Sequence, residues 1–367
     1  MSRKLAWWEP VLGAREKQLL AEVIDSGFPN DGDCTTRFER LAAEVCGVPY
    51  AVGVTSGTTA IFLALAASGV GPGDEVIVPD ITFIATANAV RLAGATPVLV
   101  DVRARDLNVD PEAVERAMTP RTRAIVPVHV SGRSADMPAL AALASRHGLA
   151  IVEDAAEAFG SRLGGRPLGS FGIGCFSFSP NKTVTTGQGG MIVTADAGIE
   201  RRLRELKDQG RPMRGTGGAD EHVSVGYNFK LTNLQAAVGV AQMESFGARV
   251  EHQRDLYRWY QEGLDGVPGV QLLEFDLEGG EVPQWVDVLV DDRDGLHDHL
   301  ERLAIGTRKL WYPLHTQVPY RQDDARFPVA TEVSRKGLWL ASALALTRED
   351  VQYACASIRD WARRSGA

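Results

Sequence analysis

Two residues of this chain, Lys182 and Asp154, have types and positions that could do chemistry together. Lys182 lies in FSFSPNKTVTTGQGG, between an apolar run and a turn rich in glycine and threonine. Burying an ammonium group without a partner is costly, and a desolvated lysine has a lowered pKa that frees its lone pair. Such a lysine is a candidate Schiff-base former. Asp154 lies upstream, where the apolar run LAIVEDAAEA ends.

An amine and a carboxylate at the ends of two strands are the two parts needed to hold pyridoxal phosphate (PLP). The amine binds the aldehyde of this cofactor, and the carboxylate keeps the pyridine nitrogen protonated, so that the ring can accept electrons. The alternative is that the two residues form a structural salt bridge. Taken alone, Lys182 and Asp154 leave both interpretations open.

A possible phosphate site lies in the segment SGTTA, which follows an apolar run and opens a helix-like stretch. Backbone N–H groups at a helix N-terminus, together with small hydroxyl residues, form an anion site. Gly57, Thr58 and Thr59 are therefore candidates to hold a phosphate group. The alternative is an ordinary helix cap, which is the commoner role of Ser or Thr at such a start.

Seven short β-branched runs recur through the first two thirds of the chain. They are AVGVT, EVIV, PVLVDV, AIVPV, AIVE, GCFSFS and GMIVT. Helix-like stretches separate most of them, which predicts a mostly parallel sheet covered on both faces. After Gln235 a long helical stretch over 234–264 leads into a smaller strand and helix pattern. The sequence predicts an α/β fold with a large domain, 1–245, and a small domain, 246–367.

Composition is that of a globular protein with two domains. The chain has 367 residues, and this length exceeds the usual size of a single core. Of these residues, 44% are hydrophobic and 23% are charged. No apolar run is long enough to span a bilayer, and the start lacks a signal-peptide core. The four cysteines are scattered, which favours a reduced cytoplasmic protein without a metal site. The net charge of −8 argues against binding nucleic acid.

Five segments together resemble the DegT/DnrJ/EryC1/StrS family of PLP-dependent sugar aminotransferases, over a region from about Glu9 to the C-terminus. The form NKT-TTG-GG is most like that of members that aminate 4-keto-6-deoxy sugars on a nucleotide. The resemblance implies the aspartate aminotransferase-like fold of type I, with a mostly parallel seven-stranded sheet and a smaller C-terminal α/β domain. The segments are VTSGTTAIFLAL, PDITFIATANAVRLAGATPVLVDV, EDAAEAFGS, SFSPNKTVTTGQGG and GYNFKLTNLQAAVG.

The resemblance implies further roles around the cofactor. Ser177 is expected on the phosphate and Phe83 stacked on the cofactor ring, although a strand serine and a core phenylalanine are the plainer alternatives. His129 matches a position near the cofactor, and packing at a strand end is its alternative. Many relatives carry Gln at the position of Glu157, where it bonds to the phenolic oxygen of PLP. An ionised Glu would be repelled by that oxygen, so Glu157 either holds a proton or contacts the substrate.

Two later segments are implied to complete the site. In GYNFKLTN, Asn228 is expected to contact the phosphate bound by the partner subunit, with Lys230 as a substrate residue, in a homodimer with shared active sites. A polar loop before a helix is the alternative. RKLWYPLHTQVPY resembles a segment near the nucleotide sugar, which makes Arg308 and His315 candidate substrate residues. His315 could equally be a surface histidine.

The chain departs from the family pattern in loops expected near the sugar. Ser131 and Gly132 stand where relatives have Tyr-Gly, and Ala341 replaces a proline. Asp31 and Asp33 occupy an N-terminal turn that is more neutral in relatives. These differences concern the identity of the substrate and leave the cofactor chemistry unaffected.

The activity implied is a ping-pong transamination. L-Glutamate gives its amino group to PLP, leaving pyridoxamine phosphate, while Lys182 acts as general base and acid in turn. The nitrogen then passes to a nucleotide-linked 3-keto or 4-keto 6-deoxyhexose, giving an NDP-amino sugar for a glycan or an antibiotic-like natural product. The nucleotide, the aminated carbon and the stereochemistry stay open.

Three other functions are compatible with parts of the pattern. One is a cyclitol or aminohydroxybenzoate-type aminotransferase of the same family. Another is a PLP-dependent sugar dehydratase, against which Lys182 argues, because that branch carries histidine there. The last is a PLP-binding regulator without turnover.

Overall fold

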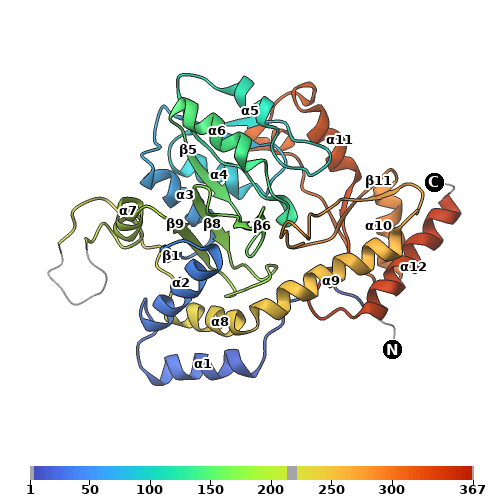
Figure 1. The fold of residues 1–367 in the computed structure, drawn as a ribbon, viewed down its shortest axis with the longest axis horizontal. Helices are drawn as coiled ribbons and strands as arrows, with labels where there is room; N and C mark the ends of the chain where they lie inside the picture. The colour runs from blue at the N-terminus through green and yellow to red at the C-terminus, as the bar shows by residue number, and fades with distance from the viewer. Residues whose placement is uncertain (1–3, 213–220, 366–367) are drawn as a thin grey trace.

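A seven-stranded sheet forms the centre of the molecule (Figure 1). The computed structural model describes residues 4–212 and 221–365. The strands are β1 (Tyr50–Val54), β2 (Glu75–Pro79), β3 (Thr96–Val100), β4 (Thr122–Ile125), β5 (Ala150–Asp154), β8 (Ile173–Ser177) and β9 (Gly190–Thr194). Their order across the sheet is β1-β9-β8-β5-β4-β2-β3. All pairs are parallel except those of β9, which is antiparallel to both of its neighbours.

Each of the seven apolar runs forms a strand of this sheet, so the predicted mostly parallel α/β sheet is confirmed. Side chains alternate along a strand. In β2, Val76 and Val78 join one core cluster and Ile77 joins another on the opposite face. The first face is covered by α3 (Gly57–Ala67), α4 (Ala85–Leu92) and α7 (Ala197–Lys207), and the second by α2 (Asp33–Cys46), α5 (Pro111–Ala117), α6 (Met137–His147) and α8 (Asn233–Glu244).

A break at Ser245 divides the stretch over 234–264 that the sequence predicts as one helix. The helix α8 ends at Glu244, and α9 (Phe246–Leu264) begins directly after the serine. The backbone N–H and the hydroxyl of Ser245 both donate to the carbonyl oxygen of Gln242, at 3.2 and 3.1 Å. A serine that bonds to a preceding carbonyl in this way competes with helix continuation. We propose that the boundary between the large and the small domain lies near Ser245.

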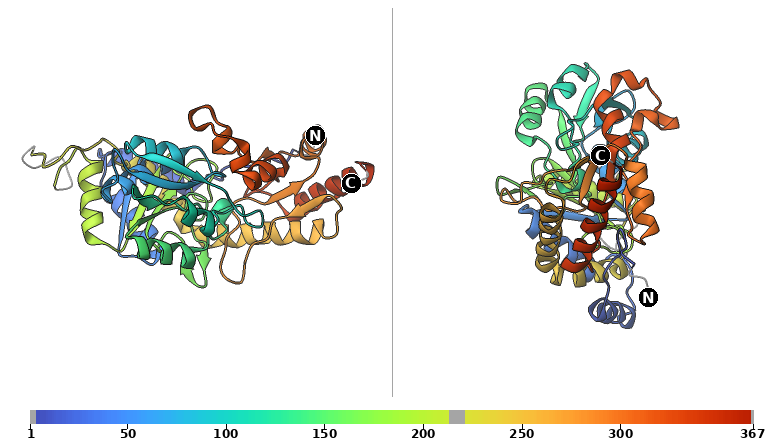
Figure 2. Two further views of the ribbon diagram at one scale, coloured as in Figure 1. Left: turned by 90° about the horizontal axis from the view of Figure 1, so that it is seen from above. Right: turned by 90° about the vertical axis from the view of Figure 1, so that its right-hand side faces the viewer.

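The C-terminal part has its own antiparallel sheet and core, and it extends from the main body along α9 (Figure 2). Its strands are β10 (Val270–Leu272), β11 (Asp287–Val290), β12 (Arg308–Lys309) and β13 (Gly337–Trp339), in the order β10-β11-β13-β12. Its helices are α9, α10 (Arg293–Arg302), α11 (Pro328–Lys336) and α12 (Arg348–Ser365). A loop over 273–286 joins β10 to β11.

The N-terminal segment ties this C-terminal part to the main body. Leu5 donates its N–H to the carbonyl of Ala304 at 2.9 Å and forms a parallel bridge with Ile305. The next element, α1 (Ala14–Asp25), packs against α8 of the main body. The short strands β6 (Arg162–Leu163) and β7 (Arg166–Pro167) form a separate hairpin. Among the helices that the structure describes, none is long and apolar enough to cross a membrane.

Candidate active site

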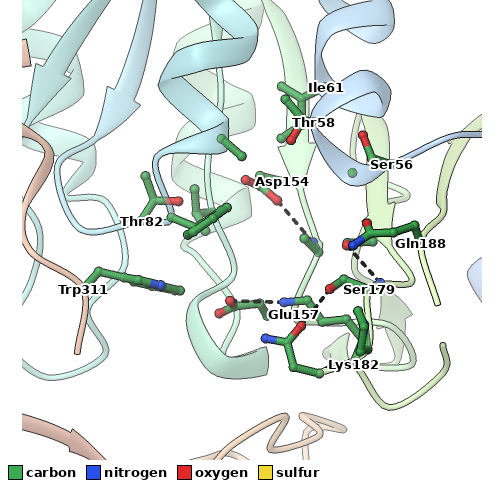
Figure 3. A pocket seen from close by; sticks show the side chains of 18 of the residues that line it. Ser56, Thr58, Ile61, Thr82, Asp154, Glu157, Ser179, Lys182, Gln188 and Trp311 are labelled. Carbon is green, nitrogen blue, oxygen red and sulfur yellow. Dashed lines mark hydrogen bonds and ion pairs between the residues drawn. The ribbon is translucent and has the colours of Figure 1, made fainter. Parts of the chain in front are cut away.

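A cavity of about 360 Å³ lies beyond the carboxyl ends of β5 and β8 and beside the N-terminus of α3. This edge of an open α/β sheet is where such folds bind ligands. Figure 3 shows Asp154 above Lys182 and Glu157, with Trp311 across from them. The residues predicted from the sequence that line the cavity are Gly57, Thr58, Phe83, Asp154, Glu157, Ser177, Lys182 and Arg308.

Ten of the lining residues form two groups, which we call the sheet wall and the lysine wall. The sheet wall comprises Ser56, Gly57, Thr58, Asp154 and Ser177. The lysine wall comprises Glu157, Lys182, Trp285, Arg308 and Trp311.

In the sheet wall, the N-terminus of α3 provides an anion site. Ser56 Oγ accepts a hydrogen bond from Thr59 N at 3.2 Å, and Thr59 Oγ1 accepts one from Ser56 N at 3.0 Å, so the two residues cap the helix reciprocally. The first N–H groups of a helix have no partner within it. Gly57 and Thr58, which carry the first N–H groups of α3, line the cavity. Such N–H groups, with the helix dipole, stabilise a bound phosphate.

The close approach of α3 and β8 also requires a glycine at position 57. A Cβ atom there would lie 2.9 Å from the Cβ atom of Ser177, closer than real Cβ atoms approach. Because Gly57 has no side chain, Ser177 lies beside the N–H groups at the start of α3. A phosphate at this place would therefore meet backbone N–H groups and the hydroxyls of Thr58 and Ser177.

Asp154, the last residue of β5, is a buried acid without a counter-ion. Its Oδ2 accepts a hydrogen bond from Thr86 Oγ1 at 2.7 Å, and its Oδ1 accepts one from Ala156 N at 3.2 Å. Burial raises the pKa of Asp154, and the bond from Thr86 opposes this effect. No described residue forms an ion pair with it. A cationic partner in the cavity would compensate this carboxylate, as a protonated ring nitrogen does.

Lys182 faces Glu157 and an indole ring in the lysine wall. Its Nζ atom lies 3.3 Å from Glu157 Oε1 and 4.7 Å from the centroid of the Trp285 ring. Only 9% of the lysine side chain is exposed. Burial raises the pKa of Glu157, while the nearby charge of Lys182 opposes that shift. Glu157 is therefore the direct hydrogen-bond partner of the amine, which the sequence left undecided.

The backbone on both sides of Lys182 is held by a side chain from the C-terminal part. Gln284 Nε2 donates to the carbonyl of Asn181 at 3.2 Å, and Gln284 Oε1 accepts from Thr183 N at 3.2 Å. Arg249 donates to the carbonyl of Thr183 at 3.2 Å. Gln284 is 3% exposed, so these bonds are shielded from water. One side chain thus fixes the residues before and after the lysine.

The other carboxylate oxygen of Glu157 is held by the turn at Ser131, one of the departures noted in the sequence. Ser131 N donates to Glu157 Oε2 at 2.9 Å, and Ser131 Oγ donates to Asp287 Oδ2 at 2.9 Å. Trp339 Nε1 donates to the same hydroxyl at 3.1 Å. The serine has a positive φ of 54°, an uncommon conformation for a residue with a side chain. The turn links Glu157 to two strands of the C-terminal part.

Thr59 and His129, both predicted near the cofactor, do not line the cavity. Thr59 uses its hydroxyl in the helix cap described above. His129 is fully buried, accepts a hydrogen bond from Ala135 N at Nδ1 and points Nε2 toward Glu153 Oε2 at 3.1 Å. His129 therefore matches the strand-end alternative.

His315 is also fully buried, so the expectation of a direct substrate contact does not hold in this structure. Its Nδ1 lies 2.5 Å from Asp80 Oδ2, and its N–H donates to Asp80 Oδ1 at 2.8 Å. Its ring stacks on Phe327 with centroids 4.7 Å apart. The histidine thus anchors the segment after Trp311 to the end of β2.

Asn228 and Lys230 lie outside the cavity of their own chain. Asn228 is exposed and forms an isolated antiparallel bridge with Asp208. Lys230 forms an ion pair with the side chain of Asp208. The segments 208–212 and 221–230 leave the main body beside α7 (Figure 1).

The residues present fit PLP. The N-terminus of α3, a buried acid that forms no ion pair with any described residue, an exposed aromatic ring at Phe83 and a shielded lysine all face one cavity. The sequence did not identify Thr86, Gln284, Trp285 or Trp311, because each acts through a contact that no local motif records. Among the described residues, no His, Cys, Asp and Glu side chains gather as a metal site.

Known proteins are similar to this chain in sequence and fold. The sequence model of the DegT/DnrJ/EryC1/StrS aminotransferase family matches residues 10–359. Identity to the GDP-perosamine synthase of Caulobacter vibrioides is 38% over 361 residues, covering 95% of this chain and 96% of that protein. Identity to the UDP-N-acetyl-3-dehydro-α-D-glucosamine 3-aminotransferase of Acidithiobacillus ferrooxidans is 39%, covering 93% and 92%. The crystal structure of S. venezuelae DesV matches with a TM-score of 0.91 and 38% identity, over 95% and 94%.

Proposed function

The chain belongs to the DegT/DnrJ/EryC1/StrS aminotransferase family, and from this premise we propose that it moves an amino group from L-glutamate to a keto sugar carried on a nucleotide. The cofactor of this family is PLP. The observation that carries the proposal is that Lys182, Asp154 and the N-terminus of α3 face the same cavity. A structural salt bridge does not explain the arrangement, because Lys182 pairs with Glu157 and Asp154 has no described ionic partner.

The residues of the two walls have separate tasks in this reaction. When bound, PLP supplies the aldehyde that takes the nitrogen and the ring that accepts the electrons of the broken bond, and pyridoxamine phosphate stores the nitrogen. The sheet wall holds the phosphate at Gly57, Thr58 and Ser177. Asp154 keeps the proton on the ring nitrogen.

In the lysine wall, the Nζ atom of Lys182 takes the proton from the α-carbon of the donor and returns it on the other side of the transfer. Glu157, at 3.3 Å, can accept a hydrogen bond from the ammonium form of the lysine. The indole of Trp285, which is 2% exposed, keeps water away from the amine. The lysine thus acts as base and acid in a site that excludes solvent.

The acceptor we propose is a 3-keto or 4-keto 6-deoxyhexose on a nucleotide. The names of the two curated relatives differ in nucleotide, GDP in one and UDP in the other. A panel of such sugars with GDP, dTDP and UDP, incubated with L-glutamate and read by mass spectrometry, tests the proposal. We expect one amino sugar as the main product. A cyclitol ketone belongs in the panel, and its amination in place of every sugar would contradict the proposal.

We further propose a homodimer in which Asn228 completes the site of the partner subunit. The exposure of Asn228 and its position outside its own cavity support this arrangement. Asn228→Ala then damages the partner's site and Lys182→Ala damages its own, so a mixed dimer keeps one intact site. With random exchange, roughly a quarter of the wild-type activity should return. If the subunits exchange and no activity returns, Asn228 acts within its own chain. We also propose that the protein works in the cytoplasm.

A further inference from the structure

Arg308 is held at the cavity by two indole rings. Its guanidinium carbon lies 5.0 Å from the centroid of Trp7 and 5.6 Å from that of Trp339. The backbone of Arg308 pairs with that of Trp339 between β12 and β13. Trp7 comes from the N-terminal segment and packs against Trp339 with centroids 6.1 Å apart. Indole faces attract a cation, so the two rings form a shelf that supports the charged end of Arg308.

The positive charge of Arg308 is not used by the described part of the protein. Its guanidinium forms no hydrogen bond or ion pair with any described residue. The other cation of the lining, Lys182, pairs with Glu157. The neighbouring Lys309, which does not line the cavity, pairs with Asp294 at 2.8 Å. Arg308 therefore offers a cation and its N–H donors to a ligand.

The two substrates of a transaminase differ in the charge that they bring to the reacting atom. In an amino acid, the α-carboxylate is bonded to the same carbon as the nitrogen that is transferred. In a nucleotide-linked 3-keto or 4-keto 6-deoxyhexose, the carbons beside the ketone carry uncharged groups. The lining already contains two carboxylates, Asp154 and Glu157. A third carboxylate entering this site requires a cation, since like charges repel at short range.

We propose that Arg308 binds the α-carboxylate of the amino-acid donor, and that the keto sugar does not depend on it. The planar guanidinium can make two parallel hydrogen bonds to a carboxylate, which a lysine cannot reproduce. The indole shelf of Trp7 and Trp339 supports Arg308 from behind, since neither tryptophan lines the cavity itself. This inference rests on the proposed function, because it assumes that an amino acid is the donor.

The test separates the two halves of the reaction in the protein loaded with cofactor. Arg308→Gln removes the charge and keeps a polar side chain. Arg308→Lys keeps the charge but cannot make two parallel hydrogen bonds to a carboxylate. For Arg308→Gln, we expect the rate constant per unit of L-glutamate to fall roughly 10- to 100-fold, the scale of lost hydrogen bonds to a charged group. Arg308→Lys should fall between this variant and the wild type. The second half, from the pyridoxamine form to the keto sugar, should stay within about 3-fold.

A comparison of donors identifies which carboxylate is bound. L-Glutamate and L-glutamine share the α-carboxylate and differ in the charge of the side chain. A loss of similar size for both donors supports the proposal. A loss for L-glutamate alone would assign Arg308 to the side-chain carboxylate and overturn the proposal, as would an unchanged rate for both. Lys309→Gln, which alters the next residue of β12, is the matched control and should react like the wild type.

A binding measurement gives a readout independent of turnover. 2-Hydroxyglutarate keeps both carboxylates and has no amine to transfer. Its binding can be followed by the fluorescence of the tryptophans beside Arg308. We expect its dissociation constant to rise roughly 10-fold or more in Arg308→Gln and to stay unchanged in Lys309→Gln. Equal binding by all three proteins overturns the inference. If the wild type reacts with no amino acid at all, the proposed function fails instead.

Discussion

The sheet wall and the lysine wall of the cavity are built over very different distances in the sequence. In the sheet wall, Ser56, Gly57 and Thr58 are consecutive, and Asp154 and Ser177 are the last residues of their strands. Their geometry follows from the helix cap and the strand ends. In the lysine wall, the backbone on either side of Lys182 is held by Gln284, about one hundred positions later. The wall exists only when the C-terminal part is packed against the sheet.

Because the two walls are built differently, substitutions in them should have different effects on the protein. The sheet wall should bind the cofactor even where the lysine wall is disturbed, because it needs no contact from the C-terminal part. The lysine wall sets the position and surroundings of the reacting amine, so its defects should appear in the rate of turnover. Substitutions in the lysine wall should therefore lower turnover while the cofactor content stays close to that of the wild type.

The largest effect is expected for Lys182→Ala. The phosphate site and Asp154 stay in place, so the variant should fold and keep bound PLP. Turnover should fall by roughly 10³-fold or more, because both the amine that holds the aldehyde and the proton carrier are lost. Cofactor content after gel filtration and the turnover rate are the two measurements. Near-normal turnover would mean that another lysine carries the reaction.

Asp154→Asn tests the sheet wall without changing its shape. The neutral amide cannot keep the ring nitrogen protonated, so we expect kcat to fall by roughly 10²-fold, the scale of a lost electrostatic stabilisation. The cofactor should still bind through its phosphate. A kcat close to that of the wild type would reduce Asp154 to a structural acid.

Gln284→Ala asks whether the lysine wall depends on the C-terminal part. Two hydrogen bonds to the backbone around Lys182 are lost, and we expect kcat to fall by about 10-fold with little change in bound cofactor.

The position of Lys182 is tested by the rate at which an amine reagent labels this lysine in the cofactor-free protein. Gln284→Ala should change this rate, whereas a general loss of stability would not be confined to one lysine. Gln271→Ala alters an exposed glutamine of the same C-terminal part and serves as the control. An unchanged kcat and labelling rate in Gln284→Ala would contradict the dependence.

The smallest effect on turnover is expected for Glu157→Gln, because the amide oxygen keeps an acceptor for the hydrogen bond from Lys182 Nζ. Burial raises the pKa of Glu157, so the folded state binds this proton more tightly than the unfolded state. The resulting stability is complete below the unfolded pKa of about 4.3 and is lost as the pH rises through the raised pKa. We expect turnover at neutral pH within about 10-fold of the wild type.

The check is the free energy of unfolding of the cofactor-free proteins as a function of pH. The wild type should lose stability relative to Glu157→Gln above about pH 4.3. Parallel curves for the two proteins would show that the folded-state pKa of Glu157 is not raised.

The sequence predicts the sheet wall well and the lysine wall only in part. The seven strands and the helix start at Ser56 follow from local patterns, and Gly57, Thr58, Asp154 and Ser177 all line the cavity as expected. Gln284 carries no local signal, because its role arises from packing between distant segments.

His315 shows the same limit in the opposite direction. Its motif is close to the expected sugar site, yet the ring is buried against Asp80 and Phe327. A sequence motif records which residue is present and cannot record which of its neighbours it contacts. The break at Ser245 similarly depends on hydrogen bonds that the helical pattern over 234–264 does not contain.

The central claim, that the two walls together perform an amino transfer, is tested most directly by a single-turnover experiment without acceptor. Protein loaded with PLP is mixed with excess L-glutamate, and 2-oxoglutarate and the visible absorbance of the cofactor are measured together. We predict about one 2-oxoglutarate per chain, a matching loss of absorbance, and recovery of the absorbance when the NDP-keto sugar is added. Absorbance that does not change, with no 2-oxo acid formed from L-glutamate or from any other amino acid, would contradict the claim.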